Sequence, residues 1–414
     1  MMKKSAPTSH RDLLDKLNER LSISEKIAFL HRVARRECAF VHRIGVAVYD
    51  SRHDLLQTFA HSSDGDSPLA HYQCKLCEAP SLYRIAMSGR PRIIHDLQAS
   101  KEGQRTHTRK IRAAAYRSSY TIPIYHQQQL AGFIFFNSRL PAVFQPTTLP
   151  HLDMIARLIS LLVTLELGQI TTLQGALRTA ACLSGHKDPE TGAHLERMAR
   201  FSRLIANALA DRHQLEDEFV EAVFWFAPMH DVGKIAIPDA ILRKPGPLSA
   251  DEFAVMKTHP VKGREMIDTL LGNFGLDDFR LASMVRHIVE YHHENMDGSG
   301  YPRGLRGNEI PLESRIVAVA DVFDALTSAR PYKKAWPNAQ AFATLREMAQ
   351  WKLDPECVEC LIAQEAAIED IQATFRDPHA EEAAASHPHE DDLHPGLFMG
   401  LHLPGKCLQL SEVF

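Results

Sequence analysis

The chain has 414 residues, of which 45% are hydrophobic and 24% are charged. This composition is typical of a soluble globular protein and excludes a fibrous or wholly disordered chain. The length predicts two or three domains, and the formal net charge of −4 argues against charge-driven binding to a nucleic-acid duplex. The unusual count is 23 histidines, because histidine is the commonest metal ligand among the side chains.

The composition of the N-terminal segment and the number of cysteines indicate the cellular compartment. The chain begins Met-Met-Lys-Lys and continues without the apolar core of a signal peptide. Its longest apolar stretch, 155–167, is interrupted by charged and hydroxyl side chains, and it is too short for a membrane span. Seven cysteines are an odd number, which favours reduced thiols. We therefore expect a cytoplasmic protein with no membrane span.

Two pairs of cysteines have the C-x-x-C spacing, Cys74 with Cys77 and Cys357 with Cys360. Four thiolates suit zinc, but these pairs are far apart in the sequence. We interpret the second pair as core cysteines of a helix, and we keep a shared zinc site as the alternative.

The first 150 residues mix helical and strand patterns. We expect a flexible segment over 1–20, followed by a domain over 21–150. Apolar spacing and β-branched runs predict its elements: a helix at 24–36, strands at 44–49 and 55–59, a helix at 81–88, a short strand at 92–94, and strands at 119–125 and 130–136. The polar linker 126–129 predicts a hairpin. This fold class is α+β with an antiparallel sheet.

A connecting helix is predicted over 151–185. Ile155, Leu158, Leu162 and Leu165 follow coiled-coil spacing. Either this helix packs on its own domain or it pairs with a second copy, and we expect a homodimer. Residues 186–365 read as an all-α domain. Residues 377–414 carry seven acidic residues, five histidines and one lysine, and this polar tail is expected to be disordered.

The helical domain contains a set of candidate metal ligands. Glu190 and His194 are four residues apart, which places both side chains on one helix face, and Asp188-Pro189 before them is typical of a helix start. Further candidates follow along the chain: His230, Asp231, His259, His292, His293 and Asp321. Imidazole and carboxylate groups without thiolate favour iron, manganese or zinc. A single histidine is more often a core residue, but eight candidates suffice for two or three metals.

One pair of motifs makes the pattern specific. The segments His230-Asp231-Val232-Gly233-Lys234 and Gly300-Tyr301-Pro302 resemble the HD-GYP domain, a subgroup of the HD metal-dependent phosphohydrolases. The resemblance implies an all-α domain that hydrolyses cyclic di-GMP to linear pGpG and possibly GMP. It also implies two or three divalent metals, iron or manganese. By position in the motif, their ligands would be Glu190, His194, His230, Asp231, His259, His292, His293 and Asp321. Asp231 would bridge two metals, and Glu190 marks members with three.

The resemblance also implies roles for residues outside the metal set. Lys234 would act with Asp231 in catalysis by stabilising phosphoryl charge or protonating the leaving oxygen. Arg330 and Lys333 would grip substrate phosphates, and Tyr301 would contact the nucleotide. The alternatives are a surface lysine for Lys234 and a packed loop aromatic for Tyr301.

Two features depart from regular helices or from the family pattern. Pro228 lies just before His230, so a helix is expected to start or kink there. Residues 350–353 read Gln-Trp-Lys-Leu, where the family often has a Gly-Thr-His-Phe-like approach to its Asp-Pro.

The N-terminal 150 residues resemble a GAF domain, a sensory module. Residues 82–91, the later strands and Gly132 carry this resemblance. It implies an unidentified small-molecule ligand. The sequence thus predicts a regulated cyclic di-GMP phosphodiesterase. Two alternatives remain open: a non-catalytic cyclic di-GMP receptor, and an HD phosphohydrolase acting on another cyclic dinucleotide.

Overall fold

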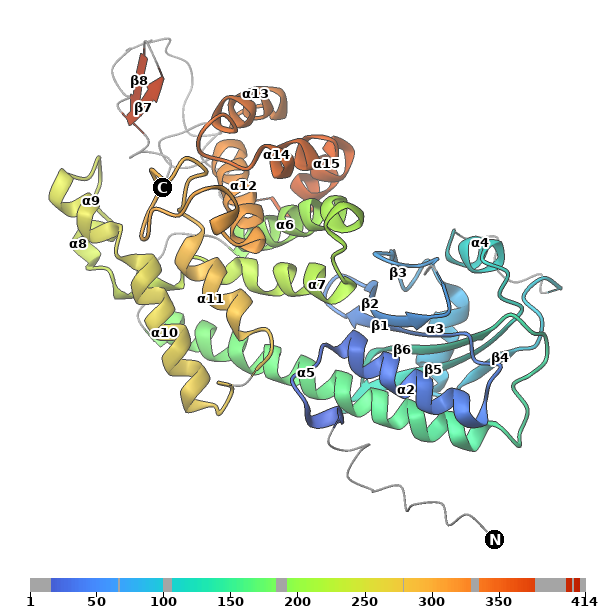
Figure 1. The fold of residues 1–414 in the computed structure, drawn as a ribbon. Helices are drawn as coiled ribbons and strands as arrows, with labels where there is room; N and C mark the ends of the chain where they lie inside the picture. Colours follow the sequence, from blue (N-terminus) through green and yellow to red (C-terminus); the bar gives the residue numbers. More distant parts are fainter. Residues whose placement is uncertain are drawn as a thin grey trace, which may run out of the picture. The chain divides into compact units, whose positions relative to one another are not determined.

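The computed structural model describes residues 16–65, 68–99, 106–183, 192–277, 279–328, 335–376, 400–403 and 406–409. Contacts divide the chain into two compact units, and each is described by itself (Figure 1). The sheet unit comprises residues 1–171 and 215–221, and the helical unit comprises residues 172–214 and 222–414. The boundary between the two units, at residues 171 and 172, falls inside a continuous helix.

The sheet unit contains a six-stranded antiparallel sheet in the order β3-β2-β1-β6-β5-β4. Its strands are β1 (Arg43–Asp50), β2 (Leu55–Ser63), β3 (Gln73–Lys75), β4 (Arg92–Ile94), β5 (Ser118–His126) and β6 (Gln129–Ser138). The predicted hairpin is the β5–β6 pair. Gly132 of β6 allows close packing, because a Cβ there would lie 2.0 Å from the carbonyl oxygen of Ala47.

One face of this sheet is covered by α2 (Ile23–Glu37) and the first turns of α5 (Leu149–Leu183). Helix α2 begins at a capping box in which Ser22 accepts from the backbone N–H of Glu25. Its His31 bonds to Ser62 of β2, and Tyr120 of β5 donates to Asp153 of α5 at 2.6 Å. These contacts fix the apolar faces of both helices on the sheet.

The opposite face packs against α3 (Pro80–Ser88). Helix α4 (Thr106–Ala113) lies between β4 and β5 in the sequence. Leu82 and Ile85 of α3 join Ala47, Leu56 and Phe133 of the sheet in one buried cluster. Neither α4 nor β3 is predicted from the sequence, because α4 is rich in basic residues and β3 is only three residues long.

Helix α5 runs for 35 residues, the same length as the helix predicted over 151–185 and begun two residues earlier. Ile155 is buried within the structure, while Met154, Leu161 and Leu165 are 66%, 65% and 58% exposed. The exposed apolar stripe therefore differs from the predicted seam at Ile155. By length and hydropathy alone, residues 149–180 would suffice to cross a membrane. Such a single helix is weak evidence for a span, since core helices of soluble proteins pass the same test.

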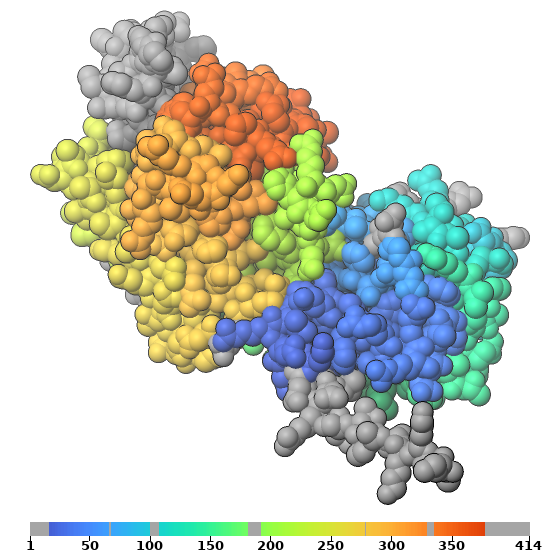
Figure 2. Space-filling view, viewed as in Figure 1, coloured from blue at the N-terminus to red at the C-terminus, as the bar shows by residue number. Residues whose placement is uncertain are grey.

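The helical unit contains the end of α5 and ten further α-helices in the described part of the chain. They are α6 (Gly192–His213), α7 (Asp217–Phe226), α8 (Asp239–Leu242), α9 (Ala250–Met256), α10 (His259–Asn273), α11 (Ala282–Tyr291), α12 (Leu312–Thr327), α13 (Asn338–Met348), α14 (Pro355–Ile362) and α15 (Glu365–Thr374). The first turns of α7, up to residue 221, belong to the sheet unit. In the space-filling view, side chains close the gaps that the ribbon leaves between these helices (Figure 2).

Irregular backbone separates several of the helices. Helix α7 ends at Phe226, and the 3₁₀ turns η1 (Ala227–Met229) and η2 (Val232–Ala236) follow, with η3 (Gly307–Glu309) later. The break at Pro228 is thus confirmed. The cap that Asp188-Pro189 predicts lies outside the described residues.

The remaining predictions concern the C-terminal part of the chain. Cys357 and Cys360 are buried on α14, as expected for core cysteines. The tail 377–399 lies outside the described residues. Beyond it, β7 (Gly400–Leu403) pairs with β8 (Lys406–Gln409), although the composition of the tail indicates disorder.

Candidate metal centre

Two groups of buried imidazole and carboxylate side chains lie inside the helical unit. One group contains Asp231, His259, His292 and His293, and the other contains His194, His230 and Asp321. Within each group, one candidate ligand atom per residue lies within 4.8 Å of all the others. The seven residues come from five segments that are distant in the sequence: α6, the η1–η2 turn, the start of α10, the end of α11, and α12. Tertiary packing alone brings them together.

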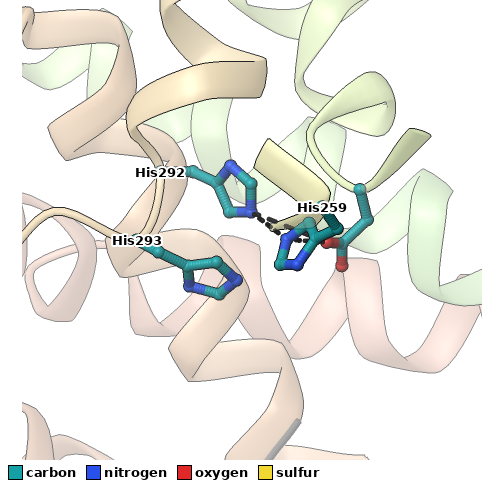
Figure 3. A group of neighbouring side chains, drawn as sticks. His259, His292 and His293 are labelled. Atoms are coloured by element: carbon teal, nitrogen blue, oxygen red, sulfur yellow. Dashed lines mark hydrogen bonds and ion pairs between the residues drawn. The ribbon is translucent and has the colours of Figure 1, made fainter. Parts of the chain in front are cut away.

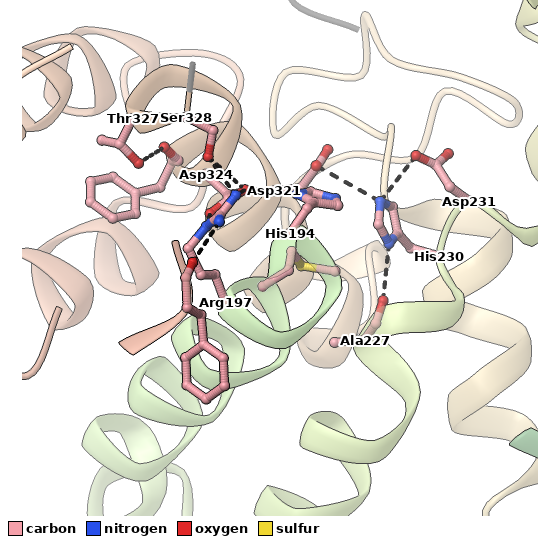
Figure 4. A network of polar contacts seen from close by, with 12 residues as sticks. His194, Arg197, Ala227, His230, Asp231, Asp321, Asp324, Thr327 and Ser328 are labelled. Carbon is pink, nitrogen blue, oxygen red and sulfur yellow. Dashed lines mark hydrogen bonds and ion pairs between the residues drawn. The ribbon is translucent and has the colours of Figure 1, made fainter. Parts of the chain in front are cut away.

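Asp231 lies between the two groups. Its Oδ2 is 3.1 Å from His230 Nε2, while its Oδ1 is 3.0 Å from His259 Nε2 and 3.6 Å from His292 Nε2. Figure 3 shows His259 and His292 turned toward one another, with their Nε2 atoms 3.4 Å apart. Figure 4 shows His230 between Asp231 and Asp321. One carboxylate therefore offers an oxygen to each group.

The far ring nitrogens of three histidines are fixed by backbone carbonyls. Nδ1 of His230 lies 3.0 Å from the oxygen of Ala227, and Nδ1 of His259 lies 2.9 Å from that of Met256. His292 Nδ1 is similarly placed on the carbonyl of Ile288 at 3.0 Å. Because a carbonyl only accepts, Nδ1 carries the proton in each ring and Nε2 keeps its lone pair. Such backing contacts orient metal-ligating histidines.

His194 is oriented by a carboxylate instead. Its Nδ1 lies 2.7 Å from Oδ2 of Asp324, and Arg197 donates to the same carboxylate from Nε at 2.6 Å and from Nη2 at 3.0 Å (Figure 4). Sequence reasoning misses both Asp324 and Arg197. Each lies three residues after a predicted site residue, Asp321 and His194, so helical spacing is the signal that points to them.

Burial and charge favour the protonation states that bind metals. Burial lowers the pKa of His292 and holds that of His293 well below its usual range. Burial alone would raise the pKa of Asp231, but Lys234 and His230 outweigh it and hold it well below the usual range. The site therefore presents neutral imidazoles around an ionised carboxylate.

Lys234 and Tyr301 lie at the same site. Lys234 Nζ is 2.7 Å from Oδ2 of Asp231, and its side chain is 12% exposed, so it is not a surface lysine. The ring of Tyr301 lies over that of His293, with 4.8 Å between ring centroids and a 32° tilt. Burial raises the pKa of its hydroxyl, which keeps the hydroxyl protonated. Both residues are close enough to the two groups to meet a ligand held there.

Two glycines of the motifs are needed for close packing. A Cβ on Gly233 would lie 1.9 Å from the backbone oxygen of His259. A Cβ on Gly300 would lie 2.3 Å from the backbone nitrogen of Asn295 and 2.6 Å from the oxygen of His293. The first contact brings η2 against α10, and the second brings the Tyr301 loop against the histidine pair.

Lys352 is a further cation that sequence reasoning does not place in the site. It is half-buried, and desolvation lowers its pKa to about 8, against the attraction of Asp321. The backbone oxygens of Trp351 and Lys352 accept from the N–H groups of Asp297 and Met296, which ties this segment to the Tyr301 loop. The departure from the family pattern at residues 350–353 is the signal that marks it.

Three predicted site residues cannot be placed. Glu190, Arg330 and Lys333 lie outside the described residues.

Comparison with protein families gives two matches. Residues 189–357 match the HD domain family and residues 27–163 match the GAF domain family. The chain combines a GAF domain with an HD domain. All seven clustered side chains lie within the matched HD range, and the sheet unit contains the whole of the matched GAF range.

The HD domain is similar to several curated proteins. Over 190 residues the chain is 46% identical to the cyclic di-GMP phosphodiesterase response regulator RpfG of Xanthomonas campestris pv. campestris, covering 46% of this chain and 47% of the relative. It is 39% identical over 211 residues to a cyclic di-GMP phosphodiesterase of Vibrio cholerae, covering 50% and 42%. It is also 39% identical over 188 residues to the 3'3'-cGAMP-specific phosphodiesterase 2 of Vibrio cholerae, covering 45% and 34%. The chain thus spans half or less of the length of these relatives.

Proposed function

We propose that this chain is a metal-dependent phosphodiesterase that hydrolyses cyclic di-GMP to linear pGpG and possibly on to GMP. The observation that carries the proposal is the pair of buried ligand groups sharing Asp231 in the HD domain. The activities named for the relatives support the substrate class, since two of the three are cyclic di-GMP phosphodiesterases.

The donor set suits two divalent metals. Asp231, His259, His292 and His293 would hold one ion. His194, His230 and Asp321 would hold another, with Asp231 shared between them. Neutral imidazoles and carboxylates without thiolate favour iron or manganese, and Glu190 is proposed to complete a third site. Metals bound there would lower the pKa of a water molecule and neutralise charge on the phosphoryl oxygens.

Side chains outside the metal-ligand groups would stabilise charge, donate a proton and bind the substrate. The Lys234 ammonium is placed beside Asp231, where it would stabilise negative charge on the phosphoryl group or donate a proton to the leaving oxygen. Tyr301 would contact the nucleotide through its ring or hydroxyl. Arg330 and Lys333 are proposed to bind the substrate phosphates, by a bidentate fork and a point charge respectively.

A different cyclic dinucleotide is the alternative substrate. The similarity to a 3'3'-cGAMP-specific phosphodiesterase supports 3'3'-cGAMP as this alternative, because the same metal-ligand groups would serve the hydrolysis of either nucleotide. A side-by-side measurement of kcat/KM for the two substrates decides between them. A receptor without activity would instead bind cyclic di-GMP tightly and leave it intact.

The decisive experiment is a turnover assay on the purified protein reconstituted separately with Fe²⁺ and Mn²⁺. We expect pGpG to form, and we expect chelation, His230→Ala or Asp231→Ala to abolish its formation. His213→Ala is the matched control, because this histidine pairs with Glu356 at 2.8 Å on an exposed face. Intact cyclic di-GMP after incubation with metal-loaded protein would reject the proposal.

We further propose that the GAF domain regulates turnover by binding a small molecule, and that the protein acts in the cytoplasm without a membrane span. Binding would act through the connecting helix α5, which is continuous from one unit into the other. Deletion of residues 1–150 without any change in activity would contradict this regulation.

A homodimer through α5 is the proposed oligomer. Met154, Leu161 and Leu165 form its exposed apolar stripe, at spacings of seven and four residues that match a coiled-coil seam. Leu161→Glu should convert the dimer to a monomer in sedimentation analysis. Arg157→Glu, an exposed position on the same helix, should leave it unchanged.

A further inference from the structure

The sheet unit encloses a cavity that the phosphodiesterase chemistry does not use. Its volume is about 360 Å³, within the size range of small-molecule sites. The strand registers place one face of β1, β5 and β6 along it, through residue pairs such as Arg43 with Asn137 and Ser119 with Asn137. The N-terminus of α3 and residues of α4 complete the wall.

A buried cation lines this cavity. Arg43 of β1 is only 1% exposed, and its guanidinium lies over Gly45, where a Cβ would be 2.4 Å from Nη1. Gly45 thus leaves the space that the guanidinium occupies. Among the described residues, its single hydrogen bond runs from Nη1 to Oδ1 of Asn137 at 3.1 Å, and the buried Nε has no acceptor.

No described carboxylate is bonded to this cation. Burial lowers the pKa of Arg43 to about 10, against the attraction of Tyr116 and Asp217. The oxygens of Asp217 are engaged by the backbone N–H of His71 at 2.5 Å and by His61 at 3.2 Å. A buried charge is costly unless it is paired and hydrogen-bonded. The buried guanidinium therefore favours an anion beside it.

The other charged side chains of the cavity wall are also positive. Arg84 and Arg92 also line the cavity, and no aspartate or glutamate is among its described lining residues. Helix α3 starts at the cavity with Pro80 and has no side-chain cap on its N-terminus, so its backbone N–H groups and dipole add positive potential. An anion is favoured by each of these features.

The other lining side chains are largely apolar, among them Leu56, Leu82, Ile94 and Phe135. A bare inorganic ion would leave this surface uncovered. We propose that the cavity binds a small organic anion, a carboxylate or phosphate monoester with an apolar body, whose charge is held by Arg43. This names the class of ligand for the GAF domain. Its binding does not depend on the phosphodiesterase activity, and the test below measures no turnover.

The test compares the affinities of charged and neutral ligands of the same shape. The whole chain is used, and a chelator in the buffer keeps it free of metal. Isothermal titration calorimetry is carried out with 3-phenylpropanoate, its neutral analogue 3-phenylpropanamide, and phenyl phosphate. We expect at least one anion to bind about 10- to 100-fold more tightly than the amide, the range for hydrogen bonds to charged groups. Which anion binds more tightly distinguishes a carboxylate from a phosphate ligand.

Arg43→Gln should remove this preference while it retains a side chain able to bond to Asn137. Arg35→Gln is the matched control, because Arg35 pairs with Asp64 on the surface at 2.6 Å, and it should bind as the unaltered protein does. Calorimetric unfolding should show that Arg43→Gln does not destabilise the unliganded protein, since it removes a buried charge with no bonded carboxylate.

Three results would overturn the proposal. They are binding of neither anion, equal affinity for acid and amide, and retention of the preference in Arg43→Gln. A lower unfolding temperature of Arg43→Gln together with an unchanged preference would assign Arg43 a structural role instead.

Discussion

Replacing Asp324 by asparagine tests whether the buried Arg197–Asp324–His194 network stabilises the HD domain. The carboxylate is fully buried and accepts two hydrogen bonds from Arg197, at 2.6 and 3.0 Å. Burial would raise its pKa, but His194 and Arg197 outweigh burial and lower it. Without this charge, Arg197 loses its counter-ion in the interior. We expect a loss of about 3–5 kcal/mol in the free energy of unfolding.

The matched control is Glu359→Gln. Glu359 accepts two hydrogen bonds from Arg346, at 2.8 and 3.1 Å, but both side chains are more than half exposed. Water replaces such a contact, so the expected loss is about 0–1 kcal/mol. The two variants thus differ in burial and not in the kind of contact.

Tryptophan fluorescence during urea unfolding of the chelated protein provides the assay. All three tryptophans, at 225, 336 and 351, belong to the helical unit. With a slope of about 2 kcal/mol per molar urea, the midpoint of Asp324→Asn should fall by about 2 M. Equal midpoints for Asp324→Asn and Glu359→Gln would refute the reasoning. Because Asp324 also orients His194, metal affinity should weaken about 10- to 100-fold, as measured by competition with a chromophoric chelator.

Five further variants separate metal binding, packing and surface charge. His259→Ala should lose bound metal and activity together, whereas Lys234→Gln should keep its metal content and lower kcat about 10²- to 10⁴-fold; loss of metal from Lys234→Gln would contradict its assignment. Gly233→Ala should destabilise the protein by about 1–3 kcal/mol in thermal unfolding, because its Cβ would meet the His259 carbonyl. Gly272→Ala, open on its helix with its nearest neighbour at 3.7 Å, should instead gain up to about 1 kcal/mol. Burial would raise the pKa of Asp268, but Arg286 and Arg264 outweigh burial and lower it from its usual value. The ion pairs of Asp268 should contribute less than about 1 kcal/mol to the free energy of unfolding, and this contribution should be present at neutral pH. The stability difference between the protein and Asp268→Asn should vanish as the pH falls through that lowered pKa, and a difference that persists would exclude these ion pairs as its cause.

The local elements followed from local chemistry. Strands β1, β5 and β6 and the hairpin between the last two were predictable, because alternating apolar residues and a short polar linker determine them within a few positions. The break before His230 was predictable for the same reason, since Pro228 cannot continue a helix. By contrast, β3 and α4 were missed because their stability comes from the sheet and cavity wall they join, and not from their own composition.

The seven clustered side chains could be named from motif and residue type. Their grouping could not, because the two groups depend on how α6, α10, α11 and α12 pack. Packing also showed that Asp231 offers one oxygen to each group. It further showed that Asp324 orients His194 and that the half-buried Lys352 lies close enough to Asp321 to interact with its charge.

The histidine excess illustrates the division between sequence and structure. Of 23 histidines, the spacing around the His-Asp and Gly-Tyr-Pro motifs selected the five that cluster, so the sequence determined which histidines are candidate ligands. Only the tertiary structure decided which of them lie in the same buried group, which nitrogen each ring presents, and where Arg43 lies buried in a cavity of the sheet unit. The reason is physical: ligand identity is a property of single side chains, whereas convergence and burial depend on contacts between segments far apart in the chain.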